Sequence, residues 1–436
     1  MKKITFLFLL QFVMANICAQ NVTIPDANFK ACLLANININ TNGDTEIQLS
    51  EAMAFTGHID CPNMNISDLE GIEAFVNITN LSCYNNNLTV LNLEQNTKLE
   101  ALAAHSNQII SVSLNTINPL LWFINLSSNQ LTNFNSIEQS ALKILVINSN
   151  QLTNLDVTQN ALLENLRCDF NQLTTLDISQ NPLLYSLLCN NNLLSSLDVT
   201  QNPLLFNLIC RNNQLINLDL TQSFLLENLD CSYNLITSLN VTNNNVLDEL
   251  ICHKNSLTSL DVSQNTMLTE LRCDLNFITN LDVSDNANLT LLTCSSNQLT
   301  FLNARNSNNT NFIGYNSQGN PQLSCIIVDD AIYSTTNWTG VDSTSTFVDN
   351  IPACNTLSTD NFSINKDVKI YPNSSNSHII IEYNGSNANI ILYNAIGQKI
   401  IETTNRYIST EVLNPGIYFA KLDFNKGIVT KKFIIK

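Results

Sequence analysis

The chain has 436 residues, of which 19 are Lys or Arg and 36 are Asp or Glu, so its formal net charge is −17. Binding to nucleic acid depends on clusters of Lys and Arg, and an acidic chain with only 13% charged residues is therefore not expected to bind it. The length indicates more than one domain.

The N-terminus has the layout of a secretory signal peptide. Two lysines precede an apolar run from Ile4 to Met14, and small and polar residues follow. Cleavage near Ala19 is expected, so residues 1–19 are assigned to the signal peptide and the mature chain to the exported side. Cys18 lacks the small preceding residue of a lipoprotein anchor, and no later stretch is long and apolar enough for a transmembrane segment.

Residues 20–56 are expected to form an N-terminal cap. After a short helical pattern around Phe29, the segment resembles a degenerate EF-hand calcium loop with Thr45 in place of the usual glycine. Its candidate metal ligands are Asn40, Asn42, Asp44, Glu46 and Glu51. Two interpretations stay open, a calcium site and a loop that only shapes the cap, and no other cofactor is expected.

A 21-residue period dominates residues 57–305. Cysteine recurs at Cys168, Cys189, Cys210, Cys231, Cys252, Cys273 and Cys294, and an asparagine follows three residues after each. The same register extends back through Ile147, Leu126 and Ala104 to Cys83, with one 22-residue step. Eleven units in succession keep the asparagine, which indicates a repeated structural unit.

Each unit reads LxxLxCxxNxLxxLDVSxNxxL and resembles a leucine-rich repeat. Independently of the resemblance, Leu166 and Cys168 alternate with Arg167 and Asp169, which is the period of a half-buried strand. We therefore expect a mainly β solenoid of 21-residue coils with capped ends, in which buried asparagines satisfy the backbone where each strand ends. The outer segment of each coil is also expected to be extended and not helical.

Four roles compete for the cysteine column: core packing, disulfides, metal binding and nucleophilic catalysis. Thiols in a line with parallel side-chain directions do not converge on a metal, and stacked Cβ atoms about 4.8 Å apart are too distant for disulfides. We favour buried, free cysteines. Outside the column, Cys325 and Cys354 are the predicted disulfide. Cys32 and Cys61 are a second candidate pair, although Cys61 and Cys83 are equally candidates for the start of the column.

A second column pairs asparagine with aspartate in the outer half of the coil. The aspartates are Asp156, Asp177, Asp198, Asp219, Asp261 and Asp282, each four residues before an asparagine or, once, a serine. Such a column of carboxylates can attract cations, but we favour a solvated face.

The chain changes character near Leu357. Residues 21–356 hold 8 Lys and Arg against 30 Asp and Glu, whereas residues 357–436 hold 9 against 6. The period breaks after Asn303, so residues 306–356, with Trp338, are assigned to a C-terminal cap and residues 357–364 to a linker.

Residues 365–436 show short alternating strands and turns, which predict a small antiparallel β-sandwich. The ordered segments "IYPNS", "LYNAIGQKI", "LNPGIYFAKL" and "KKFIIK" resemble the type A sorting domain of the bacterial type IX secretion system, with Ser374 in place of a second proline. The resemblance implies export through Sec and then type IX secretion, recognition of residues 365–436 by that machinery, and a secreted or outer-membrane surface location.

Outward strand positions vary from coil to coil, and they are the candidate ligand-binding residues. They are Arg167, Asp169, Phe170, Leu188, Ile209, Arg211, Asp230, Tyr233, Ile251, His253, Lys254, Arg272, Asp274 and Leu275. On a concave sheet they suit a protein or glycan ligand. The chain as a whole resembles internalin-like surface proteins, which implies adhesion.

Catalysis is not expected, because the four histidines lie in three regions without metal or triad spacing. The alternatives are a passive surface-layer spacer, or an exported enzyme with an unrecognised site. A binder predicts a contiguous non-acidic patch on the concave sheet, a spacer a uniform face, and an enzyme a deep pocket with perturbed titrating groups.

Overall fold

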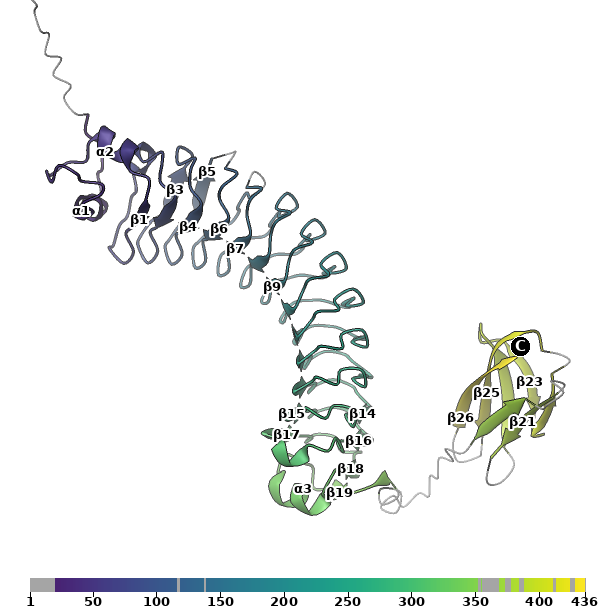
Figure 1. Cartoon of the computed structure of the whole chain (residues 1–436). Helices are drawn as coiled ribbons and strands as arrows, with labels where there is room; N and C mark the ends of the chain where they lie inside the picture. Colours follow the sequence, from purple (N-terminus) through teal and green to yellow (C-terminus); the bar gives the residue numbers. More distant parts are fainter. Residues whose placement is uncertain are drawn as a thin grey trace, which may run out of the picture. The chain divides into compact units, whose positions relative to one another are not determined.

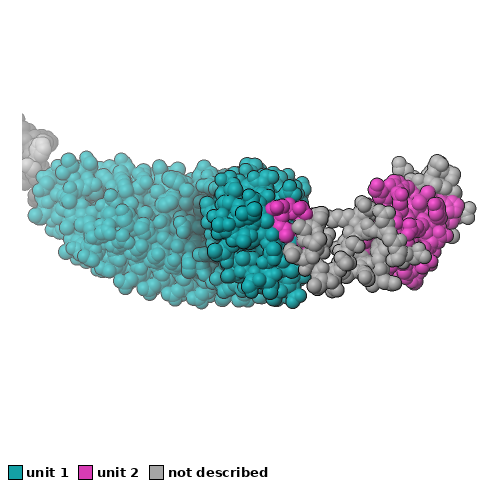
Figure 2. Space-filling view, turned by 90° about the horizontal axis from the view of Figure 1, so that it is seen from below, with its two compact units in different colours: residues 1–347 teal, residues 348–436 magenta. Residues whose placement is uncertain are grey.

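The structure is a computed structural model that describes residues 20–115, 118–136, 139–351, 354, 368–372, 378–383, 388–410, 413–423 and 428–435. The expected signal peptide and linker lie outside these residues. The chain divides into two compact units, Met1–Phe347 and Val348–Lys436, which Figure 2 shows in different colours. Each unit has a hydrophobic core of its own.

In the described part of the first unit, thirteen parallel strands form one continuous sheet, called here the long sheet. It lines the inner, concave side of a curved stack of coils (Figure 1), and this confirms the predicted solenoid. The strands in order are β1 (His58–Asp60), β2 (Asn80–Ser82), β4 (Ala101–Ala103), β6 (Phe123–Asn125), β7 (Ile144–Val146), β8 (Asn165–Arg167), β9 (Ser186–Leu188), β10 (Asn207–Ile209), β11 (Asn228–Asp230), β12 (Glu249–Ile251), β13 (Glu270–Arg272), β15 (Leu291–Thr293) and β17 (Gly314–Asn316).

In most strands of the long sheet, the central residue and the residue that follows the strand, which is cysteine in the later coils, point into the core. In β8, Leu166 is fully buried while its neighbours Asn165 and Arg167 face outward. Leu166 lies beside Leu187 of β9, and Cys168 and Cys189 are both fully buried. The alternation of apolar and polar residues in the sequence therefore corresponds to the alternation of buried and outward side chains in the strand.

The outer side of the coils is extended, as expected, and not helical. Short parallel sheets form at its two ends, and an isolated bridge joins Asn135 to Asp156 between them. The paired strands are β3 (Val90–Leu93) with β5 (Ser111–Leu114), and β14 (Asn280–Asp282), β16 (Phe301–Asn303), β18 (Cys325–Ile327) and β19 (Thr346–Val348).

Buried asparagines tie each coil to the one before it. The Asn171 side-chain nitrogen donates to the carbonyl oxygens of Ile147 and Cys168, both at 3.1 Å, and its oxygen accepts from the Leu152 N–H at 3.0 Å. The same pattern recurs around Asn192. This confirms that the column satisfies backbone groups where each strand ends.

The second asparagine column does the same on the outer side. The Asn202 amide donates to Ile178 at 3.0 Å and to Asn181 at 2.9 Å. The nearby aspartates are exposed and close turns: Asp156 accepts from the Thr158 N–H at 2.9 Å and the Thr158 hydroxyl at 2.7 Å, which lowers the pKa of Asp156. These contacts agree with a solvated face.

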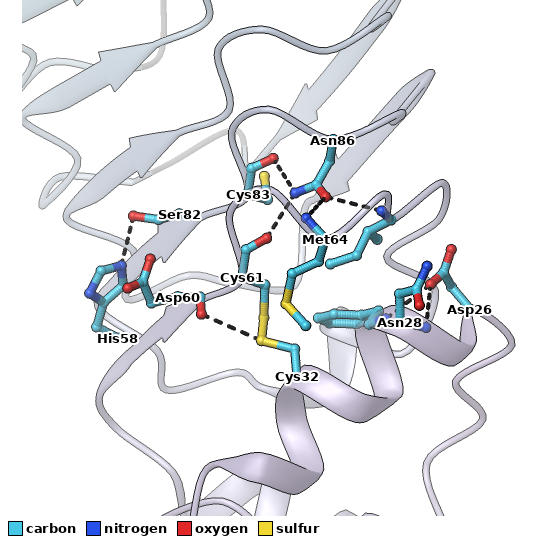
Figure 3. Close-up of a disulfide and its surroundings, with 12 residues drawn as sticks. Asp26, Asn28, Cys32, His58, Asp60, Cys61, Met64, Ser82, Cys83 and Asn86 are labelled. Carbon is cyan, nitrogen blue, oxygen red and sulfur yellow. Dashed lines mark hydrogen bonds between the residues drawn. A yellow bond between two sulfur atoms is a disulfide. The ribbon is translucent and has the colours of Figure 1, made fainter.

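The N-terminal end of the stack is closed by α1 (Ala27–Ala35), α2 (Leu49–Ala54) and η1 (Ile72–Ala74). A disulfide between Cys32 and Cys61, with Cα atoms 5.9 Å apart, joins α1 to the residue after β1 (Figure 3). This confirms the second candidate pair. Cys61 is buried beside Cys83 in the cysteine column, but because it is bonded to Cys32, the column of free thiols begins at Cys83.

At the other end, the stack continues past Asn303 where the period breaks. Strand β17 extends the long sheet, and Asn320 continues the asparagine column by accepting from the Leu299 N–H at 3.0 Å.

The C-terminal cap follows these coils. Trp338 follows α3 (Ala331–Asn337), and its ring stacks on the Tyr315 ring with centres 4.1 Å apart. Cys325 and Cys354 are both disulfide-bonded. A 3-10 turn, η2 (Asn309–Asn311), precedes β17.

The second unit contains two antiparallel sheets over a separate core that includes Ile390 and Leu422, which confirms the antiparallel sheets expected there. Ser374 lies outside the described residues. One sheet holds β20 (Lys369–Pro372), β21 (His378–Glu382) and β24 (Tyr407–Ser409); the other holds β23 (Lys399–Thr403), β22 (Asn389–Asn394), β25 (Gly416–Asp423) and β26 (Ile428–Ile435).

Candidate ligand-binding surface

The register of the long sheet places the candidate ligand residues on one face in three adjacent columns. Strand pairing puts six of them side by side in the column that ends each strand: Arg167, Leu188, Ile209, Asp230, Ile251 and Arg272. Two residues later, Asp169, Arg211, His253 and Asp274 share a column with Asn190 and Ser232. Phe170, Tyr233, Lys254 and Leu275 occupy the turn that follows.

That turn holds large side chains in an unusual backbone conformation. Phe170, Tyr233, Lys254 and Leu275 have φ between 53° and 55°, a left-handed region that costs a residue other than glycine roughly 1–2 kcal/mol. Phe170 is 51% exposed, and Tyr233 and Leu275 are 45% exposed. The turn therefore presents these side chains to solvent beside the sheet.

Cations on this face have acidic neighbours. Arg167 lies 3.9 Å from Asp169, Arg211 lies 3.8 Å from Asp230, and Arg272 pairs with Glu270. Burial raises the pKa of Asp169, although Arg167 and Arg211 act to lower it. Carboxylates thus interleave with arginines among the fourteen candidate residues, which we call the charged strip, and the charged strip is not the contiguous non-acidic patch expected of a binder.

Near the middle of the charged strip, an aromatic ring contacts two basic side chains. The Lys254 ammonium lies 4.3 Å from the centre of the Tyr233 ring, and His253 meets the same ring edge-on at 5.1 Å. Burial lowers the pKa of His253, while Asp230 and Asp274 act to raise it. Asp274 is held by the Ser295 N–H at 2.8 Å and the Ser295 hydroxyl at 2.7 Å.

A contiguous patch without charged residues lies on the same sheet, nearer its N-terminal end. We call it the uncharged patch, and its twelve half-buried outward residues are Asn80, Ser82, Tyr84, Ala101, Ala103, His105, Phe123, Asn125, Ser127, Ile144, Val146 and Asn148. None of them is Asp, Glu, Lys or Arg. The register of the repeat predicts these positions once it is extended back from Cys168 through Ile147, Leu126 and Ala104 to Cys83.

The first outward column of the later strands is not among the sequence-predicted residues. It consists of Asn165, Ser186, Asn207, Asn228, Glu249 and Glu270. Aromatic side chains flank it one residue before the strands: Trp122 is 41% exposed, and Tyr185 lies 5.8 Å from Phe206. The two-residue alternation within each strand is the signal that locates this column.

The EF-hand-like loop is held by its own side chains. The Asn40 amide donates to the Asp44 carbonyl oxygen at 3.0 Å, and the Asn42 amide donates to the Asp44 carboxylate at 2.9 Å. Glu46 forms an ion pair with Lys30 of α1 at 2.7 Å. These polar groups join the loop to itself and to the neighbouring helix.

Glu51, at the last position of the loop, caps backbone donors. It accepts from the Thr41 N–H at 2.8 Å and from the Gln48 N–H at 3.0 Å. Burial acts to raise the pKa of Glu51, but hydrogen bonds from Gln48, Thr41 and Asn42 outweigh it and lower the pKa. Calcium binding here stays a prediction, and the observed contacts support a role in shaping the cap.

The free cysteines are inaccessible. Among the described residues, Cys83, Cys168, Cys189, Cys210, Cys231, Cys252, Cys273 and Cys294 are free and buried, and this confirms the core-packing interpretation. Burial raises the pKa of Cys189 to about 12, so the thiolate that a nucleophile or a metal requires is not formed at neutral pH.

Titratable groups are dispersed across the fold. His58 contacts Ser82 at 2.8 Å, His105 and His253 lie on the concave face, and His378 belongs to the second unit. In the portion of the chain that the structure describes, no group of three or more His, Cys, Asp or Glu is placed to hold a metal ion.

Comparisons with known proteins agree with this architecture. Residues 369–436 match the family model of the secretion system C-terminal sorting domain. Internalin J of Listeria monocytogenes serotype 4b is 37% identical over 73 residues, which cover 17% of this chain and 8% of that protein. The chain therefore spans only a small part of that curated relative in sequence.

Solved structures extend the similarity to the whole repeat body. The functional domain of InlJ from Listeria monocytogenes, described as including a cysteine ladder, is 26% identical with a TM-score of 0.59, and the match covers 96% of this chain and 98% of that chain. An internalin, inlF, from Listeria monocytogenes strain 4b F2365 shares the fold at 19% identity, with a TM-score of 0.63 over 75% of this chain and 96% of that one.

The sorting domain indicates type IX secretion to the cell surface or the outside. No helix in the described residues is long and apolar enough to cross a membrane. The relatives named above are internalins. The first unit thus has an internalin-like leucine-rich repeat solenoid fold, and residues 369–436 match a secretion system C-terminal sorting domain.

Proposed function

We propose that this protein is an exported surface interaction module that binds an extracellular protein or glycan on the concave face of the long sheet, without catalysis. The observation that carries the proposal is the contrast between core and surface. Inward columns repeat leucine, cysteine and asparagine coil after coil, whereas the outward columns change from coil to coil.

A uniform face is expected of a passive spacer, and this face is not uniform. Its N-terminal part is the uncharged patch, and its later part combines ion pairs with exposed aromatic and aliphatic side chains such as Phe170, Tyr233 and Leu275. Aromatic residues and arginine are the side chains that most often carry binding energy at interfaces. The concave face therefore supports binding better than spacing.

Delivery to the surface completes the proposal. Residues 365–436 would engage the type IX machinery after residues 1–19 direct the chain through Sec. The position of the protein outside the cell would then bring the concave face to extracellular proteins and glycans.

The test is a binding screen with the purified full chain against a glycan array and isolated cell-envelope and extracellular-matrix proteins. Capture of at least one ligand is expected, with loss in a concave-face variant. One such variant, Arg211→Glu with Lys254→Glu, removes two cations from the charged strip. A second, Trp122→Ala, changes the uncharged patch.

The matched control is Lys98→Glu with Arg305→Glu, which makes the same charge change on exposed residues outside the long sheet. Capture that survives both concave-face variants would move the site elsewhere. A chain that captures nothing would favour the spacer.

A further inference from the structure

We infer that the uncharged patch on β2, β4, β6 and β7 is a binding site for a neutral saccharide chain. The inference rests on the proposed function, because it names the ligand class of one part of the same concave face. It is carried by three features of the patch: its lack of charge, the partly exposed aromatic rings at its edges, and amide and hydroxyl groups that have no hydrogen-bond partner among the described residues.

The absence of charge is notable in so acidic a body. Residues 21–356 hold 30 Asp and Glu, yet charged side chains lie only at the margin of the patch. They are Asp60 beside Ser82, Arg167 beside Val146, Glu100, and Lys143, which pairs with Glu164 at 3.0 Å. Burial lowers the pKa of His105, so its imidazole is uncharged at neutral pH. A charged ligand would find no counter-charge on the patch.

Aromatic rings stand at both edges of the patch, with small residues between them. At the entry to the strands, Trp122 is 41% exposed and lies 5.6 Å from Phe123. At the exit, Tyr84 stacks on His105 at 4.6 Å with the rings 8° from parallel. The strand between them, β4, contributes Ala103 and a second alanine, which leave the sheet open.

Several polar groups on the patch have hydrogen-bonding capacity that no described residue satisfies. The Asn125 oxygen accepts from the Ser127 N–H at 3.1 Å and from the Ser127 hydroxyl at 2.8 Å. This fixes the amide plane and leaves its two N–H donors without a bond to any residue that the structure describes. The Asn80 amide and the Tyr84 hydroxyl likewise form no bond within the described chain.

Together these groups match the chemistry of a sugar chain. Each ring of a saccharide has a C–H face that packs on an aromatic ring and hydroxyls that exchange hydrogen bonds with amides. Tyr84 follows the position equivalent to Trp122 by five residues, which is about 16 Å along a strand. That span suits an elongated chain of several rings better than a single sugar.

The experiment uses the full chain on an array of neutral glucans, mannans, galactans and N-acetylhexosamine chains, with sialylated and sulfated chains beside them. Binding to at least one neutral chain is expected. Titration calorimetry with that chain should give the same affinity at about 50 mM and about 500 mM salt, since no charges meet. Trp122→Ala and Tyr84→Ala should each weaken it at least about tenfold.

Two variants serve as controls. Tyr185→Ala removes an aromatic ring of similar exposure from a later coil and should leave saccharide affinity unchanged. Trp122→Phe keeps an aromatic face and should restore part of the affinity lost in Trp122→Ala, which separates ring contact from misfolding.

Other outcomes overturn the inference. Binding restricted to acidic glycans or to proteins does so, as does full affinity in Trp122→Ala. A protein ligand that requires Arg211 and Lys254, with no neutral saccharide bound, leaves the proposed function standing and removes this site. A chain that binds neither class overturns both.

Discussion

At the residue scale, one asparagine per coil replaces the hydrogen bonds that the backbone loses where a strand ends. Asn192 supplies two donors and one acceptor to groups on two coils, and it is buried. Leaving such backbone groups buried without partners costs about 1–3 kcal/mol each. We therefore expect Asn192→Ala to lower the free energy of unfolding by about 3 kcal/mol or more, measured by urea denaturation.

The control for this change is Asn228→Ala, which truncates an asparagine of the outward face of β11. It should cost less than about 0.5 kcal/mol, because surface substitutions remove no buried contact. Similar losses in the two variants would show that the asparagine column is not what holds the strand ends.

The buried thiols make stability depend on pH in the alkaline range. Burial raises the pKa of Cys189 from 9.0 to about 12, and that of Cys210 is also raised. Unfolded thiols ionise near pH 9 while folded ones stay neutral, so the contribution of these thiols to stability is constant below about pH 9 and falls as the pH rises toward 12. Each such thiol contributes a slope of at most about 1.4 kcal/mol per pH unit.

Denaturation midpoints measured at several pH values between about 8 and 11 test this linkage. Replacing Cys189 and Cys210 with alanine should make the decline shallower, because two groups that titrate only on unfolding are gone. The lysines and tyrosines are the same in both proteins, so the comparison isolates the two thiols. An unchanged slope would contradict the assignment of these thiols to the core.

At the element scale, the N-terminal cap depends on the disulfide that joins α1 to the first coil. Closing a loop of 29 residues is worth about 3–4 kcal/mol in the unfolded chain. Replacing Cys32 and Cys61 with serine should therefore open the cap, with faster amide hydrogen exchange in α1 and β1 and little change in β9 to β12.

Reduction supplies the internal control for the cap. A mild reductant should bring exchange in the native protein to the rate of the serine variant and leave the variant unchanged. Protection of α1 that persists in the variant would mean that packing of Phe29 and Leu33 alone holds the helix.

The sequence predicted the strands well because the same pattern recurs in coil after coil, and a single departure from it, such as Ser223 in place of asparagine, does not hide it. The charged strip was located for the same reason. The uncharged patch was not, because Ala103, Ser127 and Val146 carry no chemistry of their own until pairing places them side by side. Likewise, the period break after Asn303 conceals a strand that still joins the sheet.

At the scale of the whole molecule, the two units have separate cores and separate tasks. A chain that ends at residue 356 keeps the core of the first unit and Cys354, and it loses the sorting domain. It should melt with the circular dichroism signature of the repeat body and yet stay in the periplasm when expressed in the native host. Surface fractionation and immunoblotting of the truncated and full chains measure this.

A shorter C-terminal truncation that spares the repeats, the removal of residues 428–436, should give the same retention. Export of either shortened chain at the normal level would contradict the assignment of the sorting signal to this unit.

The constant spacing between equivalent residues has a genetic consequence. If two gene copies recombine out of step by one coil, the product gains or loses 21 residues, and every remaining side chain keeps its direction. Inheritance can therefore lengthen, shorten or reshuffle the exposed columns without disturbing what lies beneath them. A lineage that meets new partners can add or remove whole coils, and selection then acts on the exposed columns while the buried packing of each coil stays the same.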